Sequence, residues 1–127
     1  MIKVLIADDH ALFRDGLKRI FNETDDIDVV AEAIDGKDIL KKTREFDWDI
    51  ALLDINLPDI NGLDILKRIL TTNASSCVLV LSMYPEEEYA IRAIRSGASG
   101  YLTKDSPTDQ LITVIRRLAK GGKYVNP

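Results

Sequence analysis

Three carboxylates, a hydroxyl and an ammonium group each stand directly after, or at the end of, a short apolar run. They are Asp8 and Asp9, Asp54, Ser82, and Lys104. Clustered carboxylates repel one another, and a hard divalent cation such as Mg²⁺ would relieve that repulsion. A carboxylate can also act as a nucleophile and form an aspartyl phosphate, with a metal, a hydroxyl and a lysine around the transferred oxygens. The set therefore predicts metal-assisted transfer of a phosphoryl group to an aspartate.

Each of these residues also has an ordinary structural interpretation when it is taken alone. Adjacent acids such as Asp8 and Asp9 often cap a helix, and an aspartate or serine after a strand commonly forms a turn. A single lysine is usually a solvated surface residue. The chemical interpretation depends on the whole set lying together, and that depends on the fold.

Short apolar runs alternate with helical patterns along the whole chain. The predicted strands are residues 3–7, 28–33, 50–53, 77–81 and 100–103, and the predicted helices are residues 11–21, 36–44, 62–71, 85–96 and 107–120. Nearly continuous apolar runs are typical of strands covered on both faces, as in a parallel sheet. Right-handed crossovers then favour an α/β fold, a doubly wound (βα)₅ sheet with helices on both faces. Its functional site should lie at the carboxyl ends of the strands, where the candidate residues stand.

Local signals mark several helix boundaries. Pro85, followed by three glutamates, predicts the start of the fourth helix, and Gly97 predicts its end. The fifth helix should begin with a capping pattern at Ser106. The buried stripe of the first helix is expected to contain Phe13, Gly16, Leu17, Ile20 and Phe21.

The composition fits one ordinary globular domain of 127 residues. Its net charge of −4, from 17 basic and 21 acidic side chains, argues against a nucleic-acid-binding surface. The single cysteine, Cys77, cannot form an internal disulfide, and no segment is long enough to span a membrane. These features predict a cytoplasmic protein with no membrane partner.

The candidate residues stand in four longer motifs: IADDH (6–10), LLDINLPDINGLD (52–64), VLSMY (80–84) and GASGYLTKD (97–105). Taken together, these motifs resemble the response-regulator receiver (CheY-like) domain of two-component systems, in its LuxR/FixJ-like branch. The resemblance implies strand order 2-1-3-4-5 and a receiver domain over residues 1–122. Residues 123–127 would begin a linker to an absent C-terminal helix-turn-helix domain, through which alone DNA would be bound. A sensor histidine kinase would donate the phosphoryl group, the output would be transcription, and phosphorylation would promote homodimerisation.

The resemblance also implies a role for each site residue. Asp54 would be the phosphoacceptor, while Ser82 and Lys104 would contact the phosphoryl oxygens. The cofactor would be Mg²⁺ or Mn²⁺. Its ligands would be Asp9 and Asp54 directly, Asp8 through water, and the backbone carbonyl of Asn56. Tyr101 would turn inward as Ser82 moves, completing the switch.

Three positions depart from the commonest receiver pattern, and one of them, Asn61 in place of a frequent aspartate, is expected to be neutral. Met83 stands where many receivers have a small residue, so it is expected to restrict access to Asp54. Asp105 stands where many have a proline after a cis peptide bond. A cis bond before a residue other than proline costs about 3 kcal/mol, so the geometry of this bond is left open.

Several alternatives stay open at this point. A Mg²⁺-dependent phosphatase would usually carry a second aspartate at the position of Asn56, so we expect no enzyme beyond one acting on its own aspartyl phosphate. A binding module with a vestigial pocket would not need the complete set of site residues. A flavin site would need a phosphate-binding loop after the first strand. His10 is expected to be an exposed start of the first helix rather than a ligand.

Overall fold

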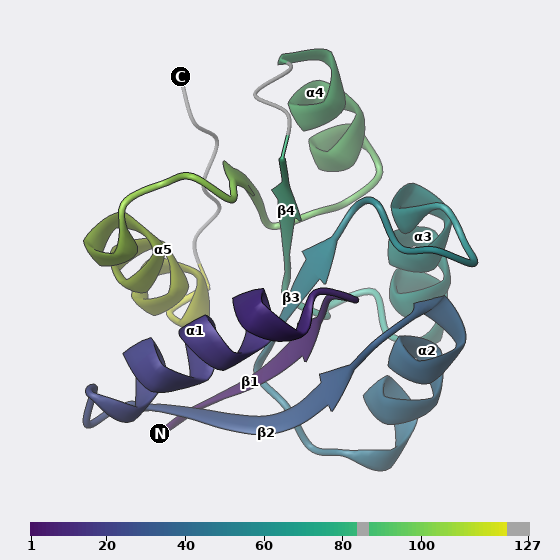
Figure 1. Cartoon of the computed structure of the whole chain (residues 1–127). Coiled ribbons are helices and arrows are strands. Elements are labelled where there is room, and N and C mark those ends of the chain that lie inside the picture. The colour runs from purple at the N-terminus through teal and green to yellow at the C-terminus, as the bar shows by residue number, and fades with distance from the viewer. Residues whose placement is uncertain (84–86, 122–127) are drawn as a thin grey trace.

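Strands and helices alternate strictly along the chain (Figure 1). In order they are β1 (Ile2–Ala7), α1 (Ala11–Asn22), β2 (Ile27–Ala33), α2 (Gly36–Glu45), β3 (Ile50–Asp54), α3 (Gly62–Thr72), β4 (Val78–Ser82), α4 (Glu87–Arg95), β5 (Gly100–Thr103) and α5 (Thr108–Ala119). This computed structural model describes residues 1–83 and 87–121. All strand pairs are parallel, and the strand order is β2-β1-β3-β4-β5. The predicted fold class and strand order are therefore confirmed.

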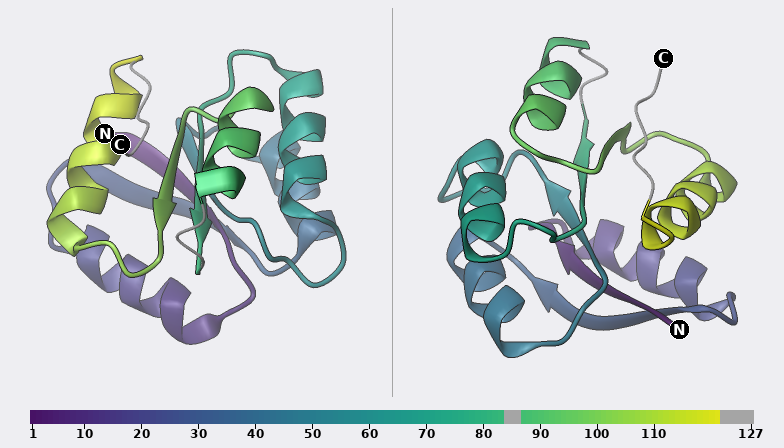
Figure 2. Two further views of the ribbon diagram at one scale, coloured as in Figure 1. Left: turned by 90° about the horizontal axis from the view of Figure 1, so that it is seen from above. Right: turned by 180° about the vertical axis from the view of Figure 1, so that it is seen from behind.

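Helices cover both faces of the sheet (Figure 2). Helices α1 and α5 pack on one face, and α2, α3 and α4 pack on the other. Each face of the sheet has its own hydrophobic core, and alternate residues of β3 pack into one or the other. Ile50 and Leu52 face α1 and α5, whereas Ala51 and Leu53 face the other three helices. Because side chains alternate across a strand, every residue of this central strand is buried. This explains its unbroken apolar sequence.

The first helix differs from its predicted pattern at one residue. Leu17 and Phe21 are buried, but Gly16 is exposed. Successive residues of an α-helix are turned by about 100° around its axis, so a residue next to Leu17 need not share its face. The prediction that Gly16 lies in the buried stripe was therefore wrong.

Two of the three local signals for helix boundaries, those at Gly97 and Ser106, lie in described residues. Gly97 ends α4 with a positive φ of 105° and a hydrogen bond from its N–H to the carbonyl of Ile94, as predicted. The predicted cap at Ser106 was wrong, because α5 has Pro107 at its N-cap and no side-chain cap. Ser106 instead closes the turn after β5, where its N–H donates to the carbonyl of Thr103. The predicted start at Pro85 and the predicted linker lie outside the described residues.

No helix in residues 1–83 and 87–121 is long and apolar enough to cross a membrane.

The loop between β3 and α3 closes on itself at Gly62. The Gly62 N–H donates to the carbonyl of Ile55 at 3.1 Å. A Cβ atom at Gly62 would lie 2.5 Å from the Cα and 2.6 Å from the carbonyl oxygen of Ile55. Because backbone atoms cannot rotate aside as a side chain would, only glycine fits here without moving the loop.

Gly62→Ala is accordingly expected to lower the free energy of unfolding by about 1–3 kcal/mol, the usual cost of overpacking. Urea denaturation measures this. Gly16→Ala is the matched control, because no heavy atom lies within 4 Å of the added Cβ and the site is an exposed helix interior. It should raise stability by about 0.5–1 kcal/mol. Equal stability of Gly62→Ala and the parent would show that the loop yields to the methyl group.

Candidate functional site

The candidate side chains meet at one edge of the sheet, at the carboxyl ends of the strands. Asp8 follows β1, Asp54 ends β3, and Ser82 ends β4. In the sheet, β3 pairs with both β1 and β4, and Ser82 is the pairing partner of Thr103 at the end of β5. Asp8, Asp54 and Ser82 are each at most 1% exposed. The topology thus buries two carboxylates and a hydroxyl together.

Lys104 supplies the compensating charge. Its Nζ lies 2.5 Å from Asp8 Oδ2 and 3.2 Å from Asp54 Oδ2, and its side chain is only 6% exposed. Its backbone N–H donates to the carbonyl of Ser82, which fixes the start of the loop after β5. The ammonium group also lies over the ring of Phe13, 4.6 Å from its centroid. One lysine therefore joins β1, β3 and α1 around the two buried acids.

Asp8 is held from several sides. Its Oδ1 accepts a hydrogen bond from the backbone N–H of His10 at 2.8 Å and lies 2.9 Å from His10 Nδ1. Arg14 donates to the backbone carbonyl of Asp8 at 2.7 Å. Asp8 Oδ2 has the ion pair with Lys104 but no partner with hydrogen-bond geometry among the described residues. A buried carboxylate oxygen is thus left able to accept a further ligand.

His10 is exposed and stands at the N-cap of α1, as expected, but its ring also contacts the acids. Its Nδ1 lies 3.2 Å from Asp9 Oδ1 as well as near Asp8, while 61% of the side chain is exposed. One ligand atom from each of Asp8, Asp9, His10 and Asp54 lies within 4.8 Å of the others. Three carboxylates face a single lysine here, and hard oxygen donors predominate. The donor set fits a divalent cation such as Mg²⁺.

The residues that follow Asp54 in the chain help to fix the position of its carboxylate. The backbone N–H of Asn56 donates to Asp54 Oδ1 at 3.0 Å, and the Ile55 N–H donates to the carbonyl of Leu81 in β4. Asn56 itself is exposed at the rim of the site. One oxygen of Asp54 is therefore turned toward the loop and the other toward Lys104.

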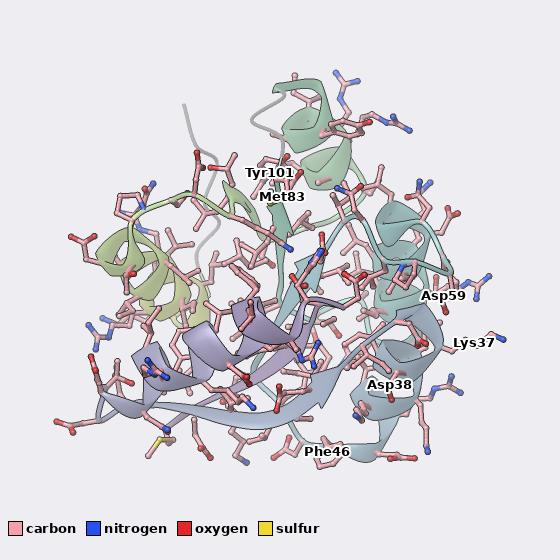
Figure 3. The ribbon with its side chains drawn as sticks, viewed as in Figure 1. Lys37, Asp38, Phe46, Asp59, Met83 and Tyr101 are labelled. Atoms are coloured by element: carbon pink, nitrogen blue, oxygen red, sulfur yellow. The ribbon has the colours of Figure 1, made fainter. Side chains whose placement is uncertain are left out.

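Three other positions named from the sequence lie around this edge. Tyr101 in β5 is 4% exposed and packs in the core on the α3 and α4 face, whereas Met83 is 63% exposed (Figure 3). Met83 lines a mostly apolar hollow together with His10, Phe13, Lys104 and Asp105. The peptide bond between Lys104 and Asp105 is trans. Met83 thus lies in the same hollow as Lys104, and its expected effect on access to Asp54 stays a prediction.

Three residues in or near the site were missed by reasoning from the sequence. Arg14 and Phe13, on the first turn of α1, approach the site because the acid pair leads straight into that helix. Their closeness in sequence to Asp8 and Asp9 is a signal that could have identified them. Asp59 contacts a helix more than twenty residues away in the chain, and no local pattern indicates that contact.

Comparison with known sequences identifies relatives over nearly the whole chain. Residues 4–116 match the family model of the response regulator receiver domain. The transcriptional regulatory protein DegU of Brevibacillus brevis is 37% identical over 126 residues, covering 99% of this chain and 53% of DegU. The oxygen regulatory protein NreC of Staphylococcus carnosus is 36% identical over 127 residues, covering 99% of this chain and 58% of NreC. The chain spans a little over half the length of these relatives.

Solved structures show the same architecture. A LuxR-family two-component response regulator from Aurantimonas sp. SI85-9A1 superposes with a TM-score of 0.92 at 29% identity, covering 98% of this chain and 88% of that one. The signal receiver domain of the response regulator NarL from Mycobacterium tuberculosis superposes with a TM-score of 0.88 at 32% identity, covering 94% of this chain and 97% of that one.

Proposed function

Because the chain belongs to the response regulator receiver domain family, we propose that it is a phosphorylation-operated signalling switch whose phosphoryl acceptor is Asp54. One observation carries this proposal. Asp54 is a buried carboxylate at the carboxyl edge of a parallel sheet, 3.2 Å from a buried lysine and beside further carboxylates that fit a metal ion. This is the arrangement needed to accept a phosphoryl group and neutralise its charge.

The metal would be Mg²⁺ or Mn²⁺. Asp8, Asp9 and Asp54 supply the carboxylate oxygens, and the backbone carbonyl of Asn56 is the remaining protein ligand in this proposal. When bound, the cation neutralises charge on the incoming phosphoryl group. The Oδ2 of Asp8 supports the assignment, because this buried oxygen is paired with Lys104 but has no partner with hydrogen-bond geometry among the described residues, and a bound cation would compensate for its burial.

In the transfer itself, the side chain of Asp54 is the nucleophile. An Asp54 carboxylate oxygen forms a bond to phosphorus while the phosphorus–nitrogen bond of a phosphohistidine on a sensor kinase breaks. The histidine of the kinase leaves with the electron pair. Lys104 already lies beside Asp54 Oδ2 and would pair with a phosphoryl oxygen, and the hydroxyl of Ser82 would donate to another. Hydrolysis returns the site to its starting state: water attacks phosphorus, the bond from phosphorus to the Asp54 oxygen breaks, and inorganic phosphate leaves.

The switch follows from the added charge. Phosphorylation brings about −1.5 to −2 charges and new acceptor oxygens to a site that holds one lysine. Ser82 and Lys104 would be drawn toward the phosphoryl group, and the backbone bond from Lys104 to Ser82 couples the two movements. Tyr101, buried beside α4, would follow Ser82 and change the surface of α4, β5 and α5. That surface would carry the output.

The output we propose is transcription. DegU is a transcriptional regulatory protein, and this chain aligns with a little over half of it. DNA would be bound through a separate C-terminal domain, since the chain itself has a net charge of −4. We place the domain in the cytoplasm with a sensor histidine kinase as its partner, and we expect phosphorylation to promote homodimerisation.

Intact-mass spectrometry tests the proposed chemistry. The chain incubated with acetyl phosphate and Mg²⁺ should gain the mass of one phosphoryl group, and the gain should disappear when EDTA removes the metal. The metal dependence is expected because two further carboxylates, those of Asp8 and Asp9, lie close to the acceptor. If the chain gained the same phosphoryl mass with EDTA as with Mg²⁺, the proposed role of the metal would be contradicted. No gain from acetyl phosphate or from a phosphorylated sensor kinase would contradict the proposed function.

A further inference from the structure

The loop at residues 55–61 connects the proposed acceptor to α3, and one of its side chains reaches across to another helix. Asp59 Oδ1 accepts a hydrogen bond from the N–H of Gly36 at 2.6 Å, and Asp59 Oδ2 accepts one from the N–H of Lys37 at 3.1 Å. Figure 3 shows Asp59 beside Lys37 at the start of α2. The carboxylate thus ties the loop to the first turn of a helix 22 and 23 residues away in sequence.

The contact between Asp59 and α2 depends on the residue types in both the loop and the helix. A Cβ atom at Gly36 would lie 2.9 Å from Asp59 Oδ1, so the absence of a side chain at Gly36 permits the close approach. The two N–H groups belong to the positive end of α2, which favours an anion. The hydrogen bond from the Gly36 N–H holds the pKa of the Asp59 carboxyl below its ordinary value. Asp59 is therefore held as a charged anchor.

The helix has a cap of its own, independent of Asp59. Asp35 accepts a hydrogen bond from the N–H of Asp38 at 2.8 Å, and Asp38 in turn accepts one from the N–H of Ile34. These bonds join residues three and four positions apart in sequence and hold the start of α2 without the loop. The bonds of Asp59 differ because they join α2 to the segment that leaves Asp54.

The loop then has fixed points along its length. Near the acceptor, the Asn56 N–H is bonded to Asp54 Oδ1. At its base, the Gly62 N–H is bonded to the carbonyl of Ile55. Asp59 lies between these points in sequence and holds its part of the loop against α2. Without Asp59, the loop that carries Asn56 would lose these two hydrogen bonds to α2.

We propose that Asp59 is a positioning residue: by anchoring the loop on α2, it places the Asn56 backbone for metal binding and phosphoryl transfer at Asp54. This inference rests on the proposed function, because it concerns the same site. Asp59 touches neither the metal ligands nor the acceptor, and acts through the loop backbone. Its removal should weaken metal binding while leaving every proposed ligand side chain in place.

Mn²⁺ affinity, measured by electron paramagnetic resonance of the free ion, tests this role. Asp59→Ala should bind Mn²⁺ about tenfold more weakly than the parent, the lower end of the effect of removing groups that orient metal ligands. Asp59→Asn should fall between the two, because one side-chain oxygen can still accept a bond from Gly36. Asp35→Ala is the matched control: it removes the cap internal to α2 but leaves the loop anchored, and should bind within about twofold of the parent.

The variants distinguish positioning from simple stabilisation. If Asp59 only stabilised α2, Asp35→Ala and Asp59→Ala would weaken Mn²⁺ binding alike, and that result would overturn the inference. Parent-like binding by Asp59→Ala, with circular dichroism showing a folded chain, would overturn it as well. A parent that neither binds Mn²⁺ nor gains a phosphoryl group would overturn the proposed function, and the positioning role with it.

Discussion

Asp54→Asn is expected to abolish phosphoryl acceptance completely, the largest effect of any single substitution in this chain. The amide is not a nucleophile toward phosphorus, whereas the carboxylate of Asp54 is. The substitution should be structurally mild, because the remaining side-chain oxygen can still accept the hydrogen bond from the Asn56 N–H. It also removes one of the carboxylates that share Lys104, so stability should not fall. Intact-mass spectrometry with acetyl phosphate and Mg²⁺ measures the outcome.

Asp64→Asn is the matched control for that experiment. Asp64 is an exposed acid in the first turn of α3, ten residues beyond the acceptor in sequence, so this variant should gain one phosphoryl group as the parent does. A full mass gain in Asp54→Asn would show that another residue accepts the group. If neither variant gained the phosphoryl mass, the cause would be the loss of a negative charge rather than the loss of the nucleophile.

Lys104→Met is expected to cause the largest loss of stability. Asp8 and Asp54 are each 1% exposed, and Lys104 is the cation that lies within ion-pair distance of both. Removing one partner of a buried ion pair leaves uncompensated charge and typically costs about 3–5 kcal/mol. The loss should appear in urea denaturation with EDTA present, and Mg²⁺ should restore part of it by neutralising the same carboxylates.

Two further variants isolate the cause. Adding Asp54→Asn to Lys104→Met should recover part of the lost stability, because one of the two buried carboxylates is then gone. Lys3→Met removes a lysine whose ion pair with Asp47 is exposed, so it should leave stability unchanged. If Lys104→Met were as stable as the parent in EDTA, Lys104 would not be the compensating charge that the geometry indicates.

The architecture could be predicted because its signals are local and repeated. Each strand is a short apolar run, and each helix has an apolar stripe, so the order of elements is readable without knowledge of any tertiary contact. The site followed from topology: once the strands are parallel, Asp8, Asp54 and Ser82 must come to the same edge. Their convergence was therefore a consequence of the fold class.

The errors and omissions have different physical origins. Gly16 was placed on the buried stripe by spacing alone, but the face a helix buries is set by its packing partners. Ser106 has the residue type of a cap, yet its N–H is bonded within the turn after β5. The bonds of Asp59 to α2 depend on how two distant loops meet, and nothing near Asp59 in the sequence encodes that contact.

The loss of a function in a variant can have more than one cause, so the acceptor is tested most directly by finding the modified residue in the parent protein. After incubation with acetyl phosphate and Mg²⁺, borohydride reduction converts an aspartyl phosphate to homoserine, and peptide mass spectrometry locates the change. We expect homoserine at position 54 alone, and none in a sample treated with EDTA. Homoserine at position 8 or 9 instead, or a stable phosphoryl group on Ser82, would contradict the central claim.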